Sequence, residues 1–174
     1  MLPLQILYLN LLMHTFPALG LTLEPAEARV MQRPPVPRST ALLPPLRLAS
    51  VIWHGLIISL VTAAIGSWGL RHGGIEHARS LTFATLATAL LLHVFCDRSP
   101  RMFRGWWAWR NRTLLVFVTV ALGLQLLALY LPPLRRLLSL TSFDAHDWLG
   151  ILGSAAASVF AIELSKGVFR AADE

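Results

Sequence analysis

Methionine, histidine and cysteine side chains stand inside long apolar runs of this sequence. Met13 and His14 are adjacent in the first run, and His93 and Cys96 lie three residues apart in the third, a spacing at which two side chains share a helix face. Thioether, imidazole and thiol groups are ligands for Cu and Zn. An ionisable His in an apolar helix is alternatively a proton-linked group. These residue types leave a soft metal site and a proton-linked site as open interpretations.

Pro17 lies in the same run, four residues after Met13. Because proline has no N–H, the carbonyl of Met13 loses its helical partner, and we expect the first helix to be broken near Pro17. Irregular backbone at membrane depth is tolerated where it lines a cavity. A freed carbonyl there is an oxygen ligand suited to a hard cation.

Composition indicates which elements must position these residues. The chain is 55% hydrophobic and 14% charged, whereas a soluble domain carries about 25% charged residues. The single cysteine excludes a disulfide framework. A helix needs about 20 apolar residues to cross a bilayer. We therefore predict an all-α membrane protein, a bundle of five transmembrane helices in the lipid bilayer, with spans at residues 2–23, 48–70, 80–96, 113–131 and 148–169.

Basic residues predict the orientation. Eleven of the fifteen Lys and Arg residues fall in residues 24–47, in residues 97–112 or near the C-terminus, and four fall on the other side. The positive-inside rule then places the C-terminus in the cytoplasm and the N-terminus outside, in a multi-pass protein of the bacterial plasma membrane. The first run lacks a basic n-region, so a removed signal peptide is not expected. The Trp-rich segment around Trp106 is interpreted as an interfacial turn rather than a nucleic-acid surface.

Sequence signatures of catalysis are not found. The chain has no Gly-rich phosphate loop, nucleophile elbow or two-His metal motif. We expect no cofactor and no confident metal site, and we do not expect this chain to be an enzyme by itself.

Four consecutive stretches near the N-terminus carry a family resemblance: PLQILYLNL from Pro3, PALGL from Pro17, EPAE from Glu24 and VMQRPP from Val30. Their order and spacing resemble the sixth membrane helix and following loop of type II cation-transporting P-type ATPases, the calcium-pump branch especially. The stretches ARSLTF from Ala78 and ELSK from Glu163 are similar to parts of the family's eighth and tenth helices. The resemblance implies that residues 1–174 are the C-terminal transmembrane domain, helices six to ten.

Most of the positions that hold cation ligands in the family carry other residue types in this sequence. The resemblance retains the family's Asn at Asn10, but its Thr falls on Met13, its Asp on His14 and an eighth-helix polar position on Leu90. A calcium site needs anionic oxygen, so we do not expect calcium binding. The resemblance adds a third interpretation of Met13 and His14, and we favour it. In this interpretation the module no longer pumps, so these two positions are no longer constrained to bind a cation. A degenerate cation path then comprises Asn10, Met13, His14, Pro17, Leu90 and His93.

Two further sets of residues are singled out. Residues 24–45 are Pro-rich, which favours an extended connection, and in the family this loop touches the phosphorylation domain. The resemblance therefore implies a docking loop with Glu24, Pro25, Arg33, Pro34 and Pro35. Inheritance of these residues from an ancestral pump, without a present docking role, explains them equally well. Glu163 and Lys166 are expected to form a structural ion pair at positions i and i+3.

These observations predict a C-terminal membrane module, truncated or separately encoded, that is not competent for ATP-driven transport alone. The chain lacks the D-K-T-G phosphorylation motif of the family. Its expected partner is a separate chain with the catalytic domains and helices one to five. One alternative is a regulatory or stabilising membrane subunit that binds a pump chain. Another is a small metal-handling protein that uses Met13, His14 and His93.

Overall fold

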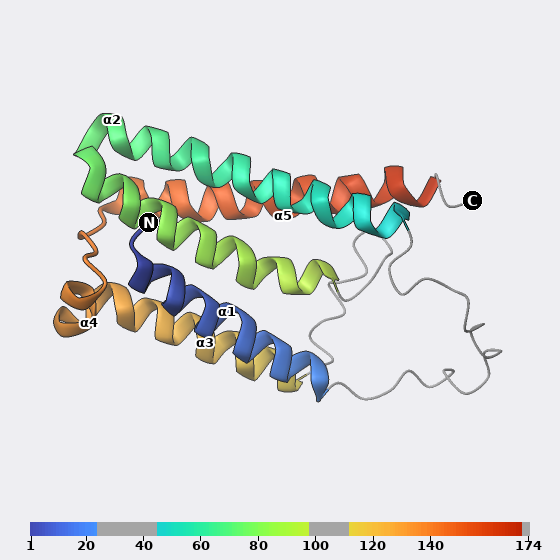
Figure 1. Ribbon diagram of the computed structural model, residues 1–174, viewed down its shortest axis with the longest axis horizontal. Helices are drawn as coiled ribbons and strands as arrows, with labels where there is room; N and C mark the ends of the chain where they lie inside the picture. The colour runs from blue at the N-terminus through green and yellow to red at the C-terminus, as the bar shows by residue number, and fades with distance from the viewer. Residues whose placement is uncertain (24–44, 98–111, 172–174) are drawn as a thin grey trace.

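The computed structural model describes residues 1–23, 45–97 and 112–171. All regular secondary structure in these ranges is helical (Figure 1). The helices are α1 (Pro3–Thr22), α2 (Pro45–Asp97), α3 (Arg112–Tyr130), α4 (Pro132–Leu137) and α5 (Ala145–Ala171). The predicted all-α class is confirmed.

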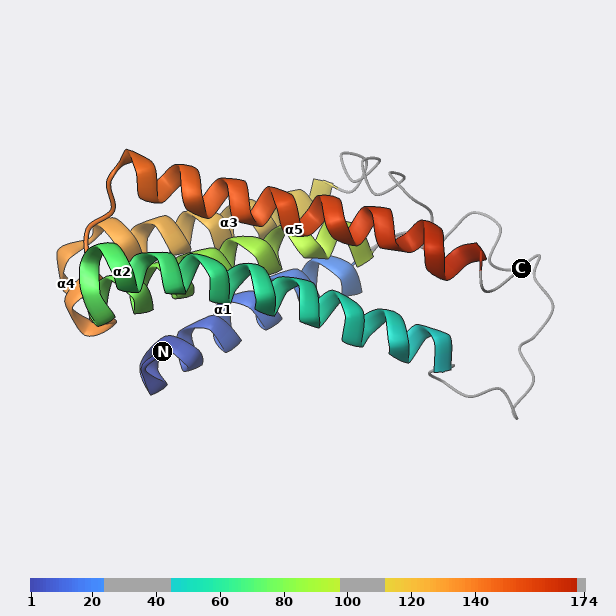
Figure 2. The same ribbon diagram turned by 90° about the horizontal axis from the view of Figure 1, so that it is seen from above.

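Helix α2 is a hairpin of two antiparallel limbs. Its 53 residues would extend about 80 Å as one straight helix, more than twice the roughly 30 Å of a bilayer core. Gly74 interrupts it with φ 75°, a left-handed conformation that glycine adopts without steric cost. The first limb, residues 45–73, and the second limb, residues 75–97, therefore lie alongside each other (Figures 1 and 2). They correspond to the second and third predicted spans.

Two clusters of buried side chains hold the bundle together. One joins α1, α3 and the second limb, with Leu12, Phe83, Ala87 and Val118 among its members. The other joins both limbs to α5 through Ile58, Ala89, Cys96, Ala155 and Ile162. The second limb contributes to both clusters, so it is the central element against which the other spans pack.

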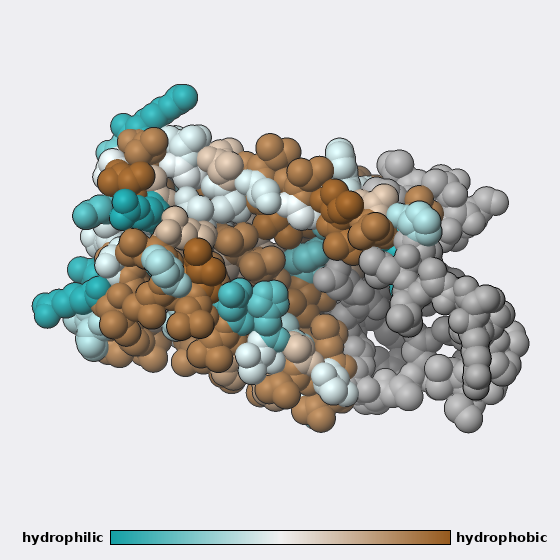
Figure 3. All heavy atoms as spheres, in the orientation of Figure 1, coloured by the Kyte–Doolittle hydropathy of each residue, from teal (hydrophilic) through white to brown (hydrophobic). Residues whose placement is uncertain are grey.

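In the described part of the chain, four helices, α1, α2, α3 and α5, are long and apolar enough to cross a membrane. Since α2 contains two of the predicted spans, the bundle has the five expected spanning segments. Many large hydrophobic side chains are exposed on its outside, and brown apolar residues cover most of the face seen in Figure 3. Exposed apolar surface on this scale is that of a bundle solvated by lipid rather than by water.

The predicted break of the first helix is wrong. Helix α1 continues through Pro17 to Thr22, with Pro17 buried. Proline removes one backbone hydrogen bond but its fixed φ remains compatible with a helix. Neighbouring helices in a membrane commonly tolerate a proline of this kind, and α1 packs here along α3 and the second limb.

The spans begin and end at two opposite ends of the bundle (Figure 1). The Gly74 end carries the hairpin turn, α4 and the N-terminus. The Asp97 end carries the C-terminal end of α1, the start of α2, the end of the second limb and the start of α3. Helix ends that flank residues 24–44 and 98–111 therefore lie at one end.

Candidate functional site

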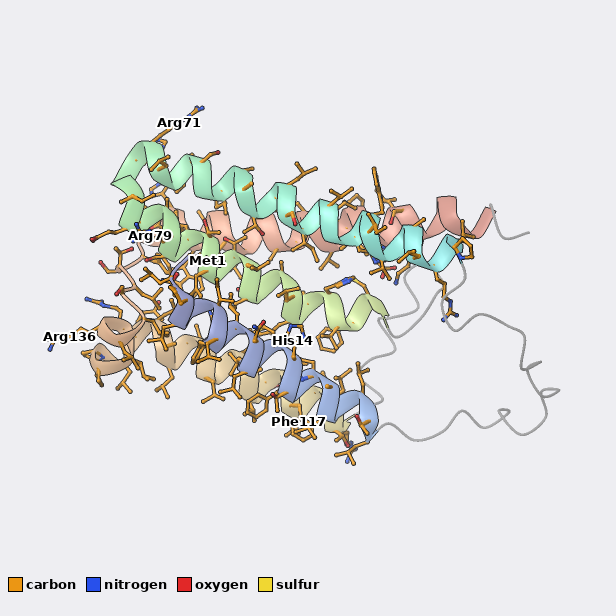
Figure 4. The ribbon with its side chains drawn as sticks, viewed as in Figure 1. Met1, His14, Arg71, Arg79, Phe117 and Arg136 are labelled. Atoms are coloured by element: carbon orange, nitrogen blue, oxygen red, sulfur yellow. The ribbon has the colours of Figure 1, made fainter. Side chains whose placement is uncertain are left out.

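Helix α1 presents a polar strip on its exposed face. Asn10 and His14 are exposed, four residues apart, and Leu7 and Leu11 beside them are more than 60% exposed. Residues at this spacing share one face of a helix. A teal spot in the brown surface of Figure 3 lies over the middle of α1, and Figure 4 shows His14 on that helix. The strip therefore places an amide and an imidazole where the bundle itself does not cover them.

Met13 and Pro17 lie on the part of α1 that the bundle covers. Both are buried, and Met13 belongs to the cluster that joins α1, α3 and the second limb. The helical repeat alone does not make this division, because the four residues lie within about 100° of one another around the helix. Packing on one side of α1 buries Met13 and Pro17 and leaves Asn10 and His14 exposed. Of the predicted cation-path residues on α1, only Asn10 and His14 share the exposed face.

Leu90 and His93 lie on the second limb. Leu90 packs against both buried clusters. The ring of His93 stacks edge-to-face on that of His54 from the first limb, with 5.2 Å between ring centroids. The two histidines are 39 residues apart in the sequence, and this contact is one that the sequence did not predict. Among the residues that the structure describes, no group of three or more His, Cys, Asp or Glu is arranged to hold a metal ion.

Glu163 and Lys166 form a buried ion pair on α5, with 2.5 Å between the Lys166 Nζ and the Glu163 Oε1. Lys166 Nζ also donates to the backbone carbonyl of Cys96 on the second limb, at 2.5 Å. That carbonyl lies in the last turn of α2, where helix carbonyls have no intrahelical partner. A cation there also complements the negative end of the helix dipole. Lys166 thus joins α5 to the end of the hairpin.

The N-terminal part of α1 is fixed by two polar side chains. The fully buried Gln5 donates from Nε2 to the carbonyl of Leu138 at 2.9 Å, and its Oε1 accepts from the N–H of Leu2 at 3.0 Å. The hydroxyl of Tyr8 donates to the carbonyl of Leu124 at 2.8 Å. These bonds connect α1 to α3 and to the turn after α4, and sequence patterns alone gave no signal for them.

His77 and Asp147 join the second limb to the start of α5 at the Gly74 end. The His77 Nε2 lies 3.0 Å from Asp147 Oδ1, and its Nδ1 lies 3.3 Å from the hydroxyl of Thr141. His77 is 17% exposed and Asp147 is 5% exposed. His77 lies in the first turn of the second limb, three residues after Gly74.

Asp144 and Asp147 cap the N-terminus of α5 reciprocally. Asp144 Oδ1 accepts from the N–H of Asp147 at 2.8 Å, and Asp147 Oδ2 accepts from the N–H of Asp144 at 2.9 Å. This is the geometry of a capping box with two carboxylates. The hydrogen bond from the Asp147 backbone lowers the pKa of the Asp144 carboxyl below its ordinary value. Two acidic residues three apart before an apolar run were the sequence signal for this cap.

The predicted docking-loop residues lie outside the described residues: Glu24, Pro25, Arg33, Pro34 and Pro35. Within the described ranges, the polar contacts of Gln5, Tyr8, His77 and Lys166 connect different helices, and the exposed polar strip belongs to α1. These features define an integral membrane protein, an all-helical bundle with a polar face on its first span.

The chain belongs to the family described as cation-transporting ATPase, C-terminus, whose model matches residues 1–168. The resemblance argued from the residues is thereby confirmed.

Curated relatives include calcium-transporting ATPases. A protein of Bacillus subtilis is 29% identical over 160 residues, which is 91% of this chain and 18% of the relative. One from Listeria monocytogenes is 29% identical over 95% of this chain and 19% of its own length. A plasma-membrane-type enzyme of Arabidopsis thaliana is 28% identical over 86% of this chain and 15% of its own length. The chain thus spans less than a fifth of these relatives and matches their C-terminal membrane part.

Proposed function

We propose that residues 1–174 form the C-terminal membrane module of a cation-transporting P-type ATPase, truncated or separately encoded. In this proposal the module works with a chain that carries the catalytic domains and helices one to five, and it does not support ATP-driven transport alone. The family match over residues 1–168 supports the assignment as a module. The small share of each relative that the chain covers supports the need for further domains.

The exposed polar strip of α1 carries the proposal. Asn10 and His14 lie on a face of a membrane-spanning helix that nothing in the described part of the chain covers. Polar groups facing lipid are costly, and ionisable residues in spans almost always face protein or a water-filled cavity. A face of this kind is therefore suited to pack against further membrane helices. The proposed occupants are the preceding spans of a pump.

Loss of oxygen ligands is the second part of the proposal. Met13 is packed in the core, and His14 stands where the resemblance implies a carboxylate. Calcium takes six to eight oxygen ligands, usually with carboxylates among them. We therefore propose a degenerate cation path that does not bind calcium. A regulatory or stabilising subunit would use the same α1 face and remains the alternative.

Orientation follows from the arginines. The proposal puts the Asp97 end and the C-terminus in the cytoplasm, with the N-terminus outside, in a bacterial plasma membrane. The helix ends that flank the Arg-rich residues 24–44 and 98–111 share one end of the bundle, which supports this arrangement. Glu24, Pro25 and the segment Arg33, Pro34, Pro35 would then dock on the cytoplasmic catalytic domain.

A chimeric pump tests the proposal. The matched C-terminal region of the Bacillus subtilis calcium-transporting ATPase is replaced by residues 1–174 and the product is purified from membranes. We expect membrane insertion without calcium-stimulated ATP hydrolysis, and recovery of that hydrolysis in the double variant Met13→Thr, His14→Asp. Parental activity in the unaltered chimera would show that the cation path is intact. A chimera that does not insert, beside a parent that does, would contradict the module assignment.

Matched variants test the α1 face in the same chimera. Leu11→Trp lies beside the polar strip on the exposed face of α1, and Leu126→Trp lies on an exposed position of α3. We expect Leu11→Trp to lower the thermal stability of the chimera and Leu126→Trp to leave it unchanged, because only the first position meets the preceding spans. Equal effects would mean that α1 faces lipid in the assembled protein.

A further inference from the structure

Three buried hydroxyl-bearing side chains lie on the two limbs of α2 and on α5, the segments that pack together in the second buried cluster. Thr62 of the first limb is 5% exposed, Thr85 of the second limb is fully buried, and Ser158 of α5 is 1% exposed. None of them belongs to the α1 strip or to the polar contacts at the two ends of the bundle. They are named below as the hydroxyl junction.

Helical spacing shows that all three side chains face the shared interior. Thr62 lies between Ile58, a member of the second buried cluster, and Ile65, which contacts Gly150 of α5. Intervals of four and three residues place these side chains on one face. By the same spacing Thr85 shares a face with Ala89 and Cys96, and Ser158 shares one with Ala155 and Ile162. Each helix thus directs its hydroxyl toward the other two.

The register of the hairpin brings Thr62 opposite Thr85. His54 faces His93 through their stacked rings, and Gly69 faces Ala78, since a Cβ on Gly69 would lie 3.2 Å from the Ala78 Cα. Thr62 lies eight residues after His54, and Thr85 lies eight residues before His93. Because antiparallel helices rise equally per residue, the two threonines stand at the same level of the hairpin.

Ser158 of α5 lies close to the height of Thr62 and Thr85 along the bundle. Helix α5 runs in the same direction as the second limb, and two contacts fix their register, His77 with Asp147 and Lys166 with the carbonyl of Cys96. Each contact joins residues that are 70 apart in sequence. Thr85 is therefore level with Ala155, and Ser158 follows within one helical turn.

The hydroxyls of Thr62 and Thr85 differ from those of other threonines in α2. Thr82 and Thr88 donate to the carbonyls four residues before them, at 2.7 and 2.8 Å. By contrast, the Oγ1 atoms of Thr62 and Thr85 are buried without a hydrogen-bond partner among the described residues. Buried polar atoms in native proteins are nearly always satisfied, and the common unseen partner is an ordered water molecule.

We propose that the hydroxyl junction binds water, with Thr62 and Thr85 as its two principal contacts. Each threonine hydroxyl offers one donor and two acceptor positions. The hydroxyl of Ser158 donates to the carbonyl of Ala155 at 2.7 Å, so its oxygen is left as an acceptor. A shared water needs two to four polar partners, and the junction supplies three, one from each limb of α2 and one from α5. The bound water then connects both limbs to α5 in the middle of the membrane.

Water-edited solid-state NMR tests the site on the whole chain in bilayers with labelled threonine. Magnetisation from water is expected to reach Thr62 and Thr85 faster than Thr88, whose hydroxyl bonds to its own helix. Build-up at Thr62 and Thr85 no faster than at Thr88 overturns the proposal. Fast magnetisation transfer that is seen in a sodium buffer but is lost when N-methylglucamine replaces the sodium also overturns the proposal, because the ligand would then be a cation.

Variants show whether the two threonines share one water. Thr85→Val keeps the side-chain volume and removes the hydroxyl, and we expect it to abolish rapid transfer at Thr62. Thr88→Val is the matched control and leaves Thr62 unaffected, while Thr85→Ser restores the transfer. Rapid transfer at Thr62 that persists in Thr85→Val overturns the shared site. The wild-type measurement is independent of how well any variant folds.

Discussion

Lys166 on α5 donates a hydrogen bond to the backbone carbonyl of Cys96, 70 residues earlier in the chain, while it pairs with Glu163 on its own helix. One ammonium group therefore caps the end of the α2 hairpin and neutralises a buried carboxylate. Both acceptors lie 2.5 Å from the Lys166 Nζ. The contact fixes the register of α5 against the second limb.

Lys166→Met is expected to destabilise the bundle by about 3 kcal/mol, because removal of one partner leaves a buried charge uncompensated. Unfolding of the purified chain in detergent measures the effect. The double variant Glu163→Gln, Lys166→Met removes both charges, and we expect it to lose less stability than Lys166→Met alone. A single variant as stable as the wild type would show that the pair does not hold α5 in place.

Gly20→Val is expected to destabilise the contact between α1 and α3 by about 2 kcal/mol through overpacking. A Cβ on Gly20 would lie 2.8 Å from the Leu114 Cδ1 and 3.1 Å from the Leu114 Cα. Gly123→Val is the matched control on α3, because a Cβ there meets nothing within 4 Å. Thermal unfolding of both variants makes the comparison, and equal midpoints would contradict close packing at Gly20.

His77→Leu and Asp147→Asn are expected to be coupled by about 1 kcal/mol, the usual net value of an intramolecular hydrogen bond. A double-mutant cycle on unfolding free energies isolates this term. His72 provides the control, because it lies in the first limb and contacts the carbonyl of Trp68 rather than α5. Replacement of His72 by Leu should therefore show additive effects with Asp147→Asn. Additivity of His77→Leu as well would rule out an energetic link.

Acid is expected to weaken the cap of α5 through Asp144. Its carboxyl has a pKa below the ordinary 3.8 because it accepts the Asp147 N–H. A lowered folded-state pKa contributes stability that is present above the unfolded-state value and is lost as pH falls through the folded-state value. The loss therefore falls below about pH 4. Asp144→Asn should reduce the difference in unfolding midpoint between pH 5 and pH 3, and an unchanged difference would contradict this role of Asp144.

Much of the architecture was predictable because it rests on local patterns. Five apolar runs of spanning length predicted the five membrane segments, and ordered stretches from Pro3 to Pro35 predicted the family. Glu163 and Lys166 lie close in sequence, and their pair needs only a helix. The predicted break at Pro17 failed because packing and the remaining backbone bonds of α1 maintain the helix past one missing N–H.

The sequence by itself determined that this protein is a helical membrane bundle of the cation-transporting ATPase C-terminal family, since hydropathy and residue order are properties of the chain. Only the tertiary structure decided which side chains meet. It buried Met13 and Pro17 and left Asn10 and His14 exposed, because neighbouring helices pack on one side of α1. It also joined His54 to His93 and Lys166 to Cys96, because these contacts depend on the hairpin turn at Gly74 and on helix register.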